Sequence, residues 1–169
     1  MPDLTKVKVG VCTVVFGGID LGHTQGGVEV TYAPEYHEVE VDKYGTSLAE
    51  QYLIGERFTA KVPLAEFTIA NLKNSMPAGT FAGAANSRIL LGSSAGKKMS
   101  TFALPLVLHP ISEGTRAFDV VMYKAIAMSE ITLNHKNDEE KIIEVEFAAL
   151  IDESKTDGNY LGLIGDSTL

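Results

Sequence analysis

Residues 26–44 read GGVEVTYAPEYHEVEVDKY, and in this stretch apolar and polar residues alternate in two runs. Successive side chains of a β-strand point to opposite faces, so the alternation predicts two strands, each with one dry and one wet face. Ala33, Pro34 and Glu35 separate the two runs. We expect these three residues to join the strands as the turn of a hairpin.

The wet faces of the two runs are almost wholly acidic, because the stretch contains five acids and one base. Like charges side by side on a sheet repel and lower stability. A chain that keeps them is expected to use their field. The candidate functional residues are therefore Glu29, Thr31, Glu38, Glu40 and Asp42. An ordinary solvated sheet face is the alternative, and the spacing alone favours it.

Length and composition indicate one globular domain. The 169 residues, 45% of them apolar, are enough for one well-buried core and too few for two. We expect a single domain over 1–169, with a core at about 6–152 and a C-terminal tail at 153–169 that docks or stays free. The formal charge of −8 argues against a protein that grips nucleic acid by neutralising phosphates.

The sequence carries no signal for secretion or for membrane insertion. It has no N-terminal apolar region and no run of about 18 apolar residues. Its single cysteine, Cys12, rules out an internal disulfide. We therefore expect a product of the cytoplasm with no membrane partner.

Alternation elsewhere predicts a mainly β protein. Strands are expected at 6–16, 57–62, 88–91, 98–108, 118–128 and 141–151, and residues 52–55 fit a strand or a helix. In the last strand Ile143, Val145, Phe147, Ala149 and Ile151 are predicted to point inward, with 126–133 as the partner strand.

Only residues 64–76 show helical spacing, and Pro77 ends them. The one apolar stripe of this predicted helix consists of Ala65, Ile69, Leu72 and Met76. Residues 78–96 are rich in small and polar side chains, which indicates a long loop around the short strand at 88–91.

One motif suggests an enzyme. Residues 92–96, GSSAG, match the G-x-S-x-G nucleophile elbow, with Ser94 as nucleophile and Asp119 and His135 in the matching chain order. An elbow needs a helix after it in a large parallel sheet, and residues 97–105 lack helical spacing. We interpret the segment as a flexible turn and expect no enzymatic activity. The four histidines and the cysteine lack metal-ligand spacing, so no metal or other cofactor is expected.

Several short motifs follow one another along the chain. They are Leu21-Gly22 with Gly26-Gly27-Val28, then Val41-Asp42-Lys43-Tyr44-Gly45, then Val62-Pro63-Leu64-Ala65-Glu66 and, before the last long apolar strand, Asn137-Asp138-Glu139-Glu140. Their order resembles the tail tube proteins, also called major tail proteins, of non-contractile-tailed bacteriophages over about residues 6–152. None of the motifs is a catalytic signature.

The resemblance implies a structural protein of the virion. It implies a tail-tube-type β-sandwich or barrel with one flanking helix, stacked as hexameric rings whose inner strands join into a continuous barrel around a lumen for DNA. The implied partners are other copies of the chain, the tape measure protein and the tail tip and terminator proteins. The implied location is the virion tail, after assembly in the host cytoplasm.

Together with the acidic runs, the resemblance predicts what lines the lumen. We expect Glu29, Thr31, Glu38, Glu40 and Asp42 to face the passing DNA. Carboxylates repel phosphates, so DNA would be ejected through the tube without sequence-specific binding. The loop at 78–96 suits contacts between rings.

A second class of protein fits many of the same features, namely a β-sandwich module that binds a small molecule or a glycan. The absence of Trp weakens a glycan platform of stacked rings. Particle size separates the two classes, because a tube subunit forms rings or long polymers and a binding module stays small.

Overall fold

The computed structural model describes residues 10–112, 114–133, 135 and 140–168. The strands are β1 (Cys12–Phe16), β2 (Ile19–Asp20), β3 (Glu29–Glu40), β4 (Leu48–Leu64), β5 (Thr80–Ala82), β6 (Arg88–Leu90), β7 (Leu104–Pro110), β8 (Asp119–Ala127), β9 (Ile143–Ala149) and β10 (Gly162–Gly165). The helical elements are α1 (Ile69–Ser75) and the short 3-10 turns η2 (Asp42–Tyr44), η3 (Ala84–Asn86), η4 (Met99–Phe102) and η5 (Arg116–Phe118). With 46% strand, the fold is mainly β with a flanking helix, and that part of the predicted fold class is confirmed.

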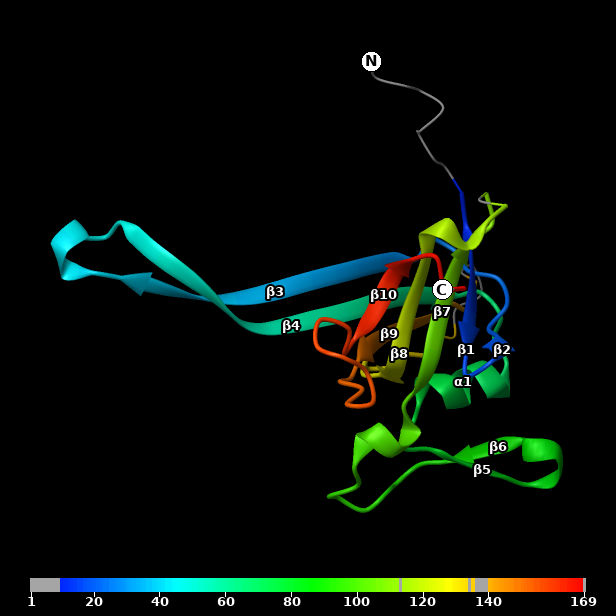
Figure 1. Cartoon of the computed structure of the whole chain (residues 1–169). Helices are drawn as coiled ribbons and strands as arrows, with labels where there is room; N and C mark the ends of the chain where they lie inside the picture. Colours follow the sequence, from blue (N-terminus) through cyan, green and yellow to red (C-terminus); the bar gives the residue numbers. More distant parts are fainter. Residues whose placement is uncertain (1–9, 113, 134, 136–139, 169) are drawn as a thin grey trace.

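Most strands belong to one antiparallel sheet. Its order is β2-β1-β7-β8-β9-β4-β3, with β10 paired to β8. The rings of Phe16 in β1 and Phe147 in β9 lie 4.9 Å apart, although these strands are not neighbours in the sheet. This short distance shows that the sheet curls. β5 and β6 form a separate hairpin below the curled sheet in the view of Figure 1.

The core lies inside this curl and confirms much of the predicted last strand. Ile143, Val145 and Phe147 of β9 are buried, as the alternation predicted. Ile151 lies after the end of β9 and is 62% exposed, so its predicted inward orientation is wrong. β9 pairs with β8 only at 125–127 and with β4 at 59–64, so the predicted partner at 126–133 is mostly wrong.

The predicted hairpin turn at 33–35 is wrong, because β3 continues through these residues as one strand. Proline is tolerated in an edge strand, where its missing N–H breaks no ladder, and β3 is the last strand of the sheet. The chain turns instead between β3 and β4, around η2. There Gly45 has a φ of 64°, a conformation that favours glycine.

The predicted helix begins later than expected. β4 extends to Leu64, and α1 begins only at Ile69. The side chain of Thr68 accepts a hydrogen bond from the backbone N–H of Asn71 at 3.1 Å, which caps the first turn. Of the predicted apolar stripe, Leu72 is buried and Ile69 is exposed.

Other boundaries also differ from the prediction. Within the described residues the first strand begins at Cys12, and the predicted strand at 98–108 opens with the 3-10 turn η4 before β7. Residues 78–96 contain the β5–β6 hairpin in addition to loop. The acidic motif at 137–140 lies mostly outside the described residues.

The C-terminal tail docks on the sheet. β10 pairs with the first half of β8, from Gly162 opposite Met122 to Gly165 opposite Asp119. The approach at Gly162 is close, because a Cβ there would collide with the backbone oxygen of Val121. β10 therefore forms part of the fold.

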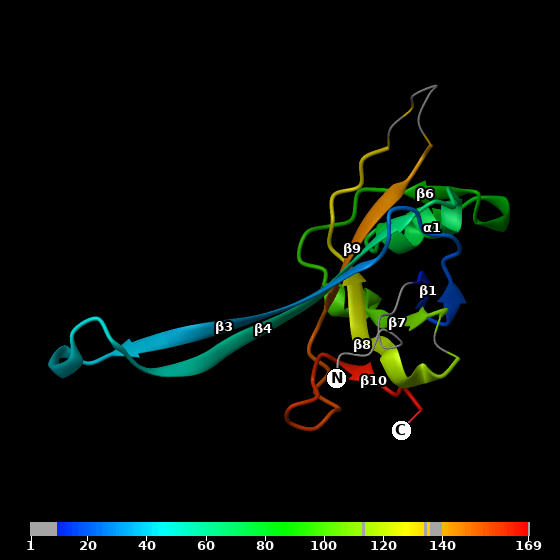
Figure 2. The ribbon, with the colours of Figure 1, turned by 90° about the horizontal axis from the view of Figure 1, so that it is seen from above.

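β3 and β4 continue far beyond the curled sheet as a two-stranded ribbon (Figure 1). A second view, from above, shows the same ribbon standing away from the body (Figure 2). We call residues 33–57 the arm, and the paired residues 29–32 and 58–61 its root. The arm is the most conspicuous feature of the molecule.

Candidate functional site

The arm is long, and in the described structure it pairs only with itself. β3 has 12 residues, which at about 3.3 Å each gives a strand of about 40 Å. β9 pairs with β4 only from Thr59 to Leu64. Along the arm, the outer edges of both strands therefore have no strand partner among the described residues. Such a two-stranded ribbon is marginally stable alone in water, and its open edges invite another chain to pair.

One face of the arm begins as a continuation of the apolar face of the core, and Glu38 and Glu40 occupy this same face further out. Directly opposite residues share a face of a sheet. At the root, Tyr32 lies opposite the buried Phe58. In the arm, Tyr36 lies opposite Leu53, and each is 53% exposed. On this face Val30 and Phe58 pack on the core, whereas Tyr32 is already 52% exposed, so the face becomes wet at the outer end of the root.

The opposite face carries charges that are offset near the root. Glu29 lies opposite Lys61 in the register, and Thr31 lies opposite Thr59. Further along, Glu35 Oε1 is 3.1 Å from Arg57 Nε. The bases of β4 therefore reduce the acidity that was predicted for this wet face.

The acids nearer the tip are not offset in this way. Glu38 accepts a hydrogen bond from Gln51 Nε2 at 3.1 Å. Within the described part of the chain, no salt bridge involves Glu38, Glu40, Asp42 or Glu50. Like charges here repel, and Lys43 is the one Lys or Arg in the sequence from Glu38 to Glu50.

The structure places the five predicted site residues on one ribbon but not on one face. Glu29, Thr31, Glu38 and Glu40 lie in β3, and Asp42 lies in η2. All five are exposed. Because side chains alternate along a strand, Glu29 and Thr31 have the opposite parity to Glu38 and Glu40. That they line a lumen stays a prediction.

Where the arm meets the body, it forms one wall of a groove. The groove has a volume of about 510 Å³ and lies between the arm and residues 157–164. The hydroxyl of Tyr32 donates a hydrogen bond to Glu56 Oε1 there, and this bond raises the pKa of Tyr32. The groove is therefore mixed, with apolar rings beside a carboxylate.

The β4 strand is longer than its partner within the arm. The register passes from Glu35 opposite Gly55 to Tyr36 opposite Leu53, which leaves Ile54 without a partner in β3. A second shift between Val39 and Glu40 leaves Ala49 without one. Both extra residues belong to β4, as in β-bulges.

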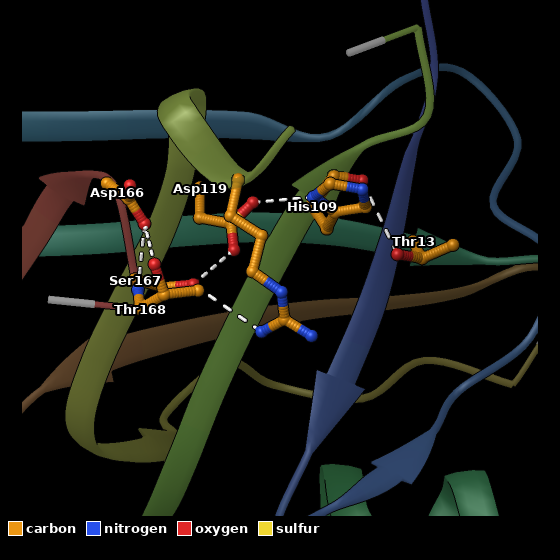
Figure 3. A network of polar contacts seen from close by, with 7 residues as sticks. Thr13, His109, Asp119, Asp166, Ser167 and Thr168 are labelled. Atoms are coloured by element: carbon orange, nitrogen blue, oxygen red, sulfur yellow. Dashed lines mark hydrogen bonds and ion pairs between the residues drawn. The ribbon is translucent and has the colours of Figure 1, made fainter. Parts of the chain in front are cut away.

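The residues of the hypothetical nucleophile elbow are not assembled into a triad. Ser94 lies in an exposed loop, and among the described residues no hydrogen bond joins it to Asp119 or His135. Asp119 is buried and accepts hydrogen bonds from His109 Nδ1 at 2.6 Å and Ser167 Oγ at 2.5 Å (Figure 3). In a triad the histidine lies between the serine and the carboxylate. Here the carboxylate of Asp119 lies between His109 and Ser167, and its hydrogen bond from Ser167 holds the C-terminal segment to the sheet.

Sequence reasoning missed a basic stretch of the chain. Residues 73–98, which we call the basic segment, contain four bases and no acid, a net charge of +4. The bases are Lys73 in α1, Arg88 in β6, and Lys97 and Lys98 in the loop after it; the last three are exposed, and burial lowers the pKa of Lys73. The signal was present in the sequence, because no Asp or Glu occurs between Glu66 and Glu113.

An apolar groove lies beside the basic segment. It has a volume of about 620 Å³. Its larger apolar lining residues are Met76, Pro77, Leu91, Met99, Ile126, Met128, Ile131 and Leu150. Methionine side chains are flexible and adapt to varied partners. Leu91 and Met128 are exposed there, so the described chain does not cover this groove.

Other kinds of site find little support. In the described ranges, no three His, Cys, Asp or Glu side chains come together in a way that could hold a metal ion. No helix in the described part of the chain is long and apolar enough to span a membrane. No protein-family model matches the chain, and no curated protein matches it. What the protein does must therefore be inferred from the arm, its edges and its charges.

Proposed function

We propose that the chain is a structural subunit that assembles with copies of itself into stacked hexameric rings, as the tail tube proteins that it resembles do. The observation that carries the proposal is the arm. It combines two open strand edges with exposed apolar side chains such as Tyr36 and Leu53.

An isolated arm of this kind is a liability for a monomer. Open edges and exposed apolar side chains promote uncontrolled pairing and aggregation. A neighbouring copy removes both problems, because an added strand satisfies the backbone groups and its side chains cover the apolar face. A ring that closes on itself leaves no free edge.

In such a tube the predicted acidic lumen has two separable halves. Glu29 and Thr31 belong to the root, and Glu38, Glu40 and Asp42 belong to residues 36–53, the outer part of the arm that we call the tip. The chain's net charge of −8 supports passage of DNA without retention. Tape measure, tail tip and terminator proteins would be its further partners in a virion tail assembled in the host cytoplasm.

Negative-stain imaging and sedimentation of the purified chain test the proposal. We expect rings or hollow tubes at high concentration or with an initiator complex. The matched control shortens the arm by replacing residues 37–52 with Asn-Gly, a two-residue hairpin turn, between the paired Tyr36 and Leu53. This variant should fold and stay monomeric. Compact wild-type monomers under every condition would contradict the proposal.

A binding module is the second candidate, and the groove beside Tyr32 favours it. Its volume of about 510 Å³ lies within the usual range for ligand pockets. A module of this class would stay monomeric with the arm intact. It would also gain thermal stability with a small molecule or glycan that fills the groove.

A further inference from the structure

Two protruding parts of the chain carry opposite charge. The arm, residues 33–57, has six acids and two bases, a net charge of −4. The basic segment, residues 73–98, has four bases and no acid, a net charge of +4. Complementary charge of this size steers association and fixes which surfaces meet.

The two parts cannot meet within one chain as it is folded. The arm leaves one side of the body, and the β5–β6 hairpin lies toward the other side in both views (Figures 1 and 2). Their attraction is therefore unused within one chain, and a second copy can satisfy it. A contact between two different surfaces of identical chains is head-to-tail, and it repeats from copy to copy.

Apolar surfaces accompany the charges on both parts. The tip of the arm exposes Val41, Tyr44, Leu48 and Tyr52 among its acids. Beside the basic segment lies the apolar groove of about 620 Å³. Lys97 is at its rim, because Lys97 Nζ donates to Ser93 Oγ at 3.0 Å and Ser93 Oγ donates to the oxygen of the groove residue Ala78 at 2.8 Å. The groove therefore offers apolar contact with the cation of Lys97 beside it.

We infer that the arm tip of one copy docks on the basic segment of a second copy. The apolar side chains of the tip enter the methionine-lined groove, and Glu38, Glu40 and Glu50 face Arg88, Lys97 and Lys98. The inference rests on the proposed function only in that copies associate. It assigns Glu38 and Glu40 to a subunit contact and leaves the predicted lumen to Glu29 and Thr31.

Two full-length variants with reversed charges test the contact. The first, the arm variant, carries Glu38→Lys, Glu40→Lys and Glu50→Lys, which changes the arm from −4 to +2. The second, the segment variant, carries Arg88→Glu, Lys97→Glu and Lys98→Glu, which changes the basic segment from +4 to −2. All six positions are exposed, so both variants should keep the wild-type melting temperature.

Each variant alone should associate about a hundredfold more weakly than wild type in sedimentation, because arm and segment then carry charge of the same sign. An equimolar mixture should recover association, since each arm again finds a segment of opposite charge. The control Glu130→Lys, Glu144→Lys and Glu153→Lys makes the same change of +6 at exposed positions off the arm and should associate like wild type.

Wild-type association of either variant alone, or a mixture that recovers nothing, would overturn the inference. If both variants form rings, the inference is overturned but the proposed function is left intact. Charge-dependent open chains without rings would support the contact and contradict the tube. If the segment variant loses binding to a labelled DNA duplex while it associates like wild type, the basic segment binds nucleic acid and the inference fails.

Discussion

The root and the tip of the β3–β4 ribbon are made of the same two strands, but their side chains have different environments. At the root the apolar face packs on the core, and Glu29 faces Lys61. Toward the tip this face is exposed at Tyr36 and then carries Glu38 and Glu40, which form no salt bridge among the described residues. The comparison teaches that an alternating pattern specifies a strand but not its environment. The residues opposite the strand and the layer packed behind it decide whether its side chains stabilise the monomer or stay free to contact another chain.

The largest expected effect is at the root side. Phe147 is fully buried in β9, opposite Ala60 of β4. Phe147→Ala should lower the free energy of unfolding by about 3–5 kcal/mol, because a ring-sized cavity remains. Chemical denaturation measures this. The matched control Ile151→Ala, at a side chain that is 62% exposed, should change it by no more than about 0.5 kcal/mol; equal losses would show that the burial is misassigned.

Truncating a side chain of the arm should leave the stability of the monomer nearly unchanged and weaken self-association instead. Tyr36→Ala removes an exposed ring, so the monomer's free energy of unfolding should change by about 0.5 kcal/mol or less. Self-association should weaken about tenfold, since aromatic side chains at interfaces contribute more than about 1 kcal/mol when they are hot spots. Sedimentation equilibrium gives the dissociation constant. A destabilised monomer with unchanged association would remove the distinction between root and tip.

The root acid Glu29 tests the lumen separately from the contact. Glu29→Lys changes the charge of each subunit by +2 and places a lysine opposite Lys61. Tubes should still form, and their lumen should retain DNA at low salt and release it as salt rises. The measurement is genome delivery by assembled particles at two salt concentrations. Unaffected delivery would place Glu29 on an outer surface.

The body offers a compensated acid with which the tip acids can be compared. A hydrogen bond from Lys124 is the main reason that the pKa of Asp152 is lowered from 3.8 to about 2. A lowered pKa stabilises the fold above the unfolded value of 3.8, and this contribution is lost as pH falls toward about 2. Lys124→Met should raise the pKa of Asp152, which carboxyl NMR titration would detect. An unchanged pKa would mean that Ser154 alone holds it down.

The smallest expected effect is at the boundary between root and tip. The ion pair of Glu35 and Arg57 is exposed on both sides. A double-mutant cycle with Glu35→Gln and Arg57→Gln should give a coupling of about 0.2–1 kcal/mol that decreases with salt. A much larger coupling would indicate that this pair is shielded from water in the assembled state.

Much of the fold followed from local pattern. The strands around Phe147 and Phe58 were predictable, because period-2 alternation and burial agree there. The turn at Pro34 was wrong, because a proline in an edge strand and a proline in a turn give the same local sequence. The helix began late because Pro63 belongs to the end of β4, which pairing with β9 stabilises.

The candidate site was less predictable than the fold. Exposure of the acids followed from alternation, but their compensation did not. Glu29 lies opposite Lys61, which is more than 30 residues away in the sequence, only because of the register of β3 and β4. The basic segment, in contrast, could have been found from the sequence, since the absence of acids from 67–112 needs no structure.

The two residues of β4 that lack partners, Ile54 and Ala49, give the arm edges of unequal contour length. At about 3.3 Å per residue, β4 is up to about 7 Å longer than β3 over the same stretch. A ribbon with one longer edge bends toward the shorter edge, and its local twist increases. The curvature of the arm is thus encoded by the position of two residues. Deleting Ile54 and Ala49 would straighten the arm and change the direction in which its tip points, with every charge left in place.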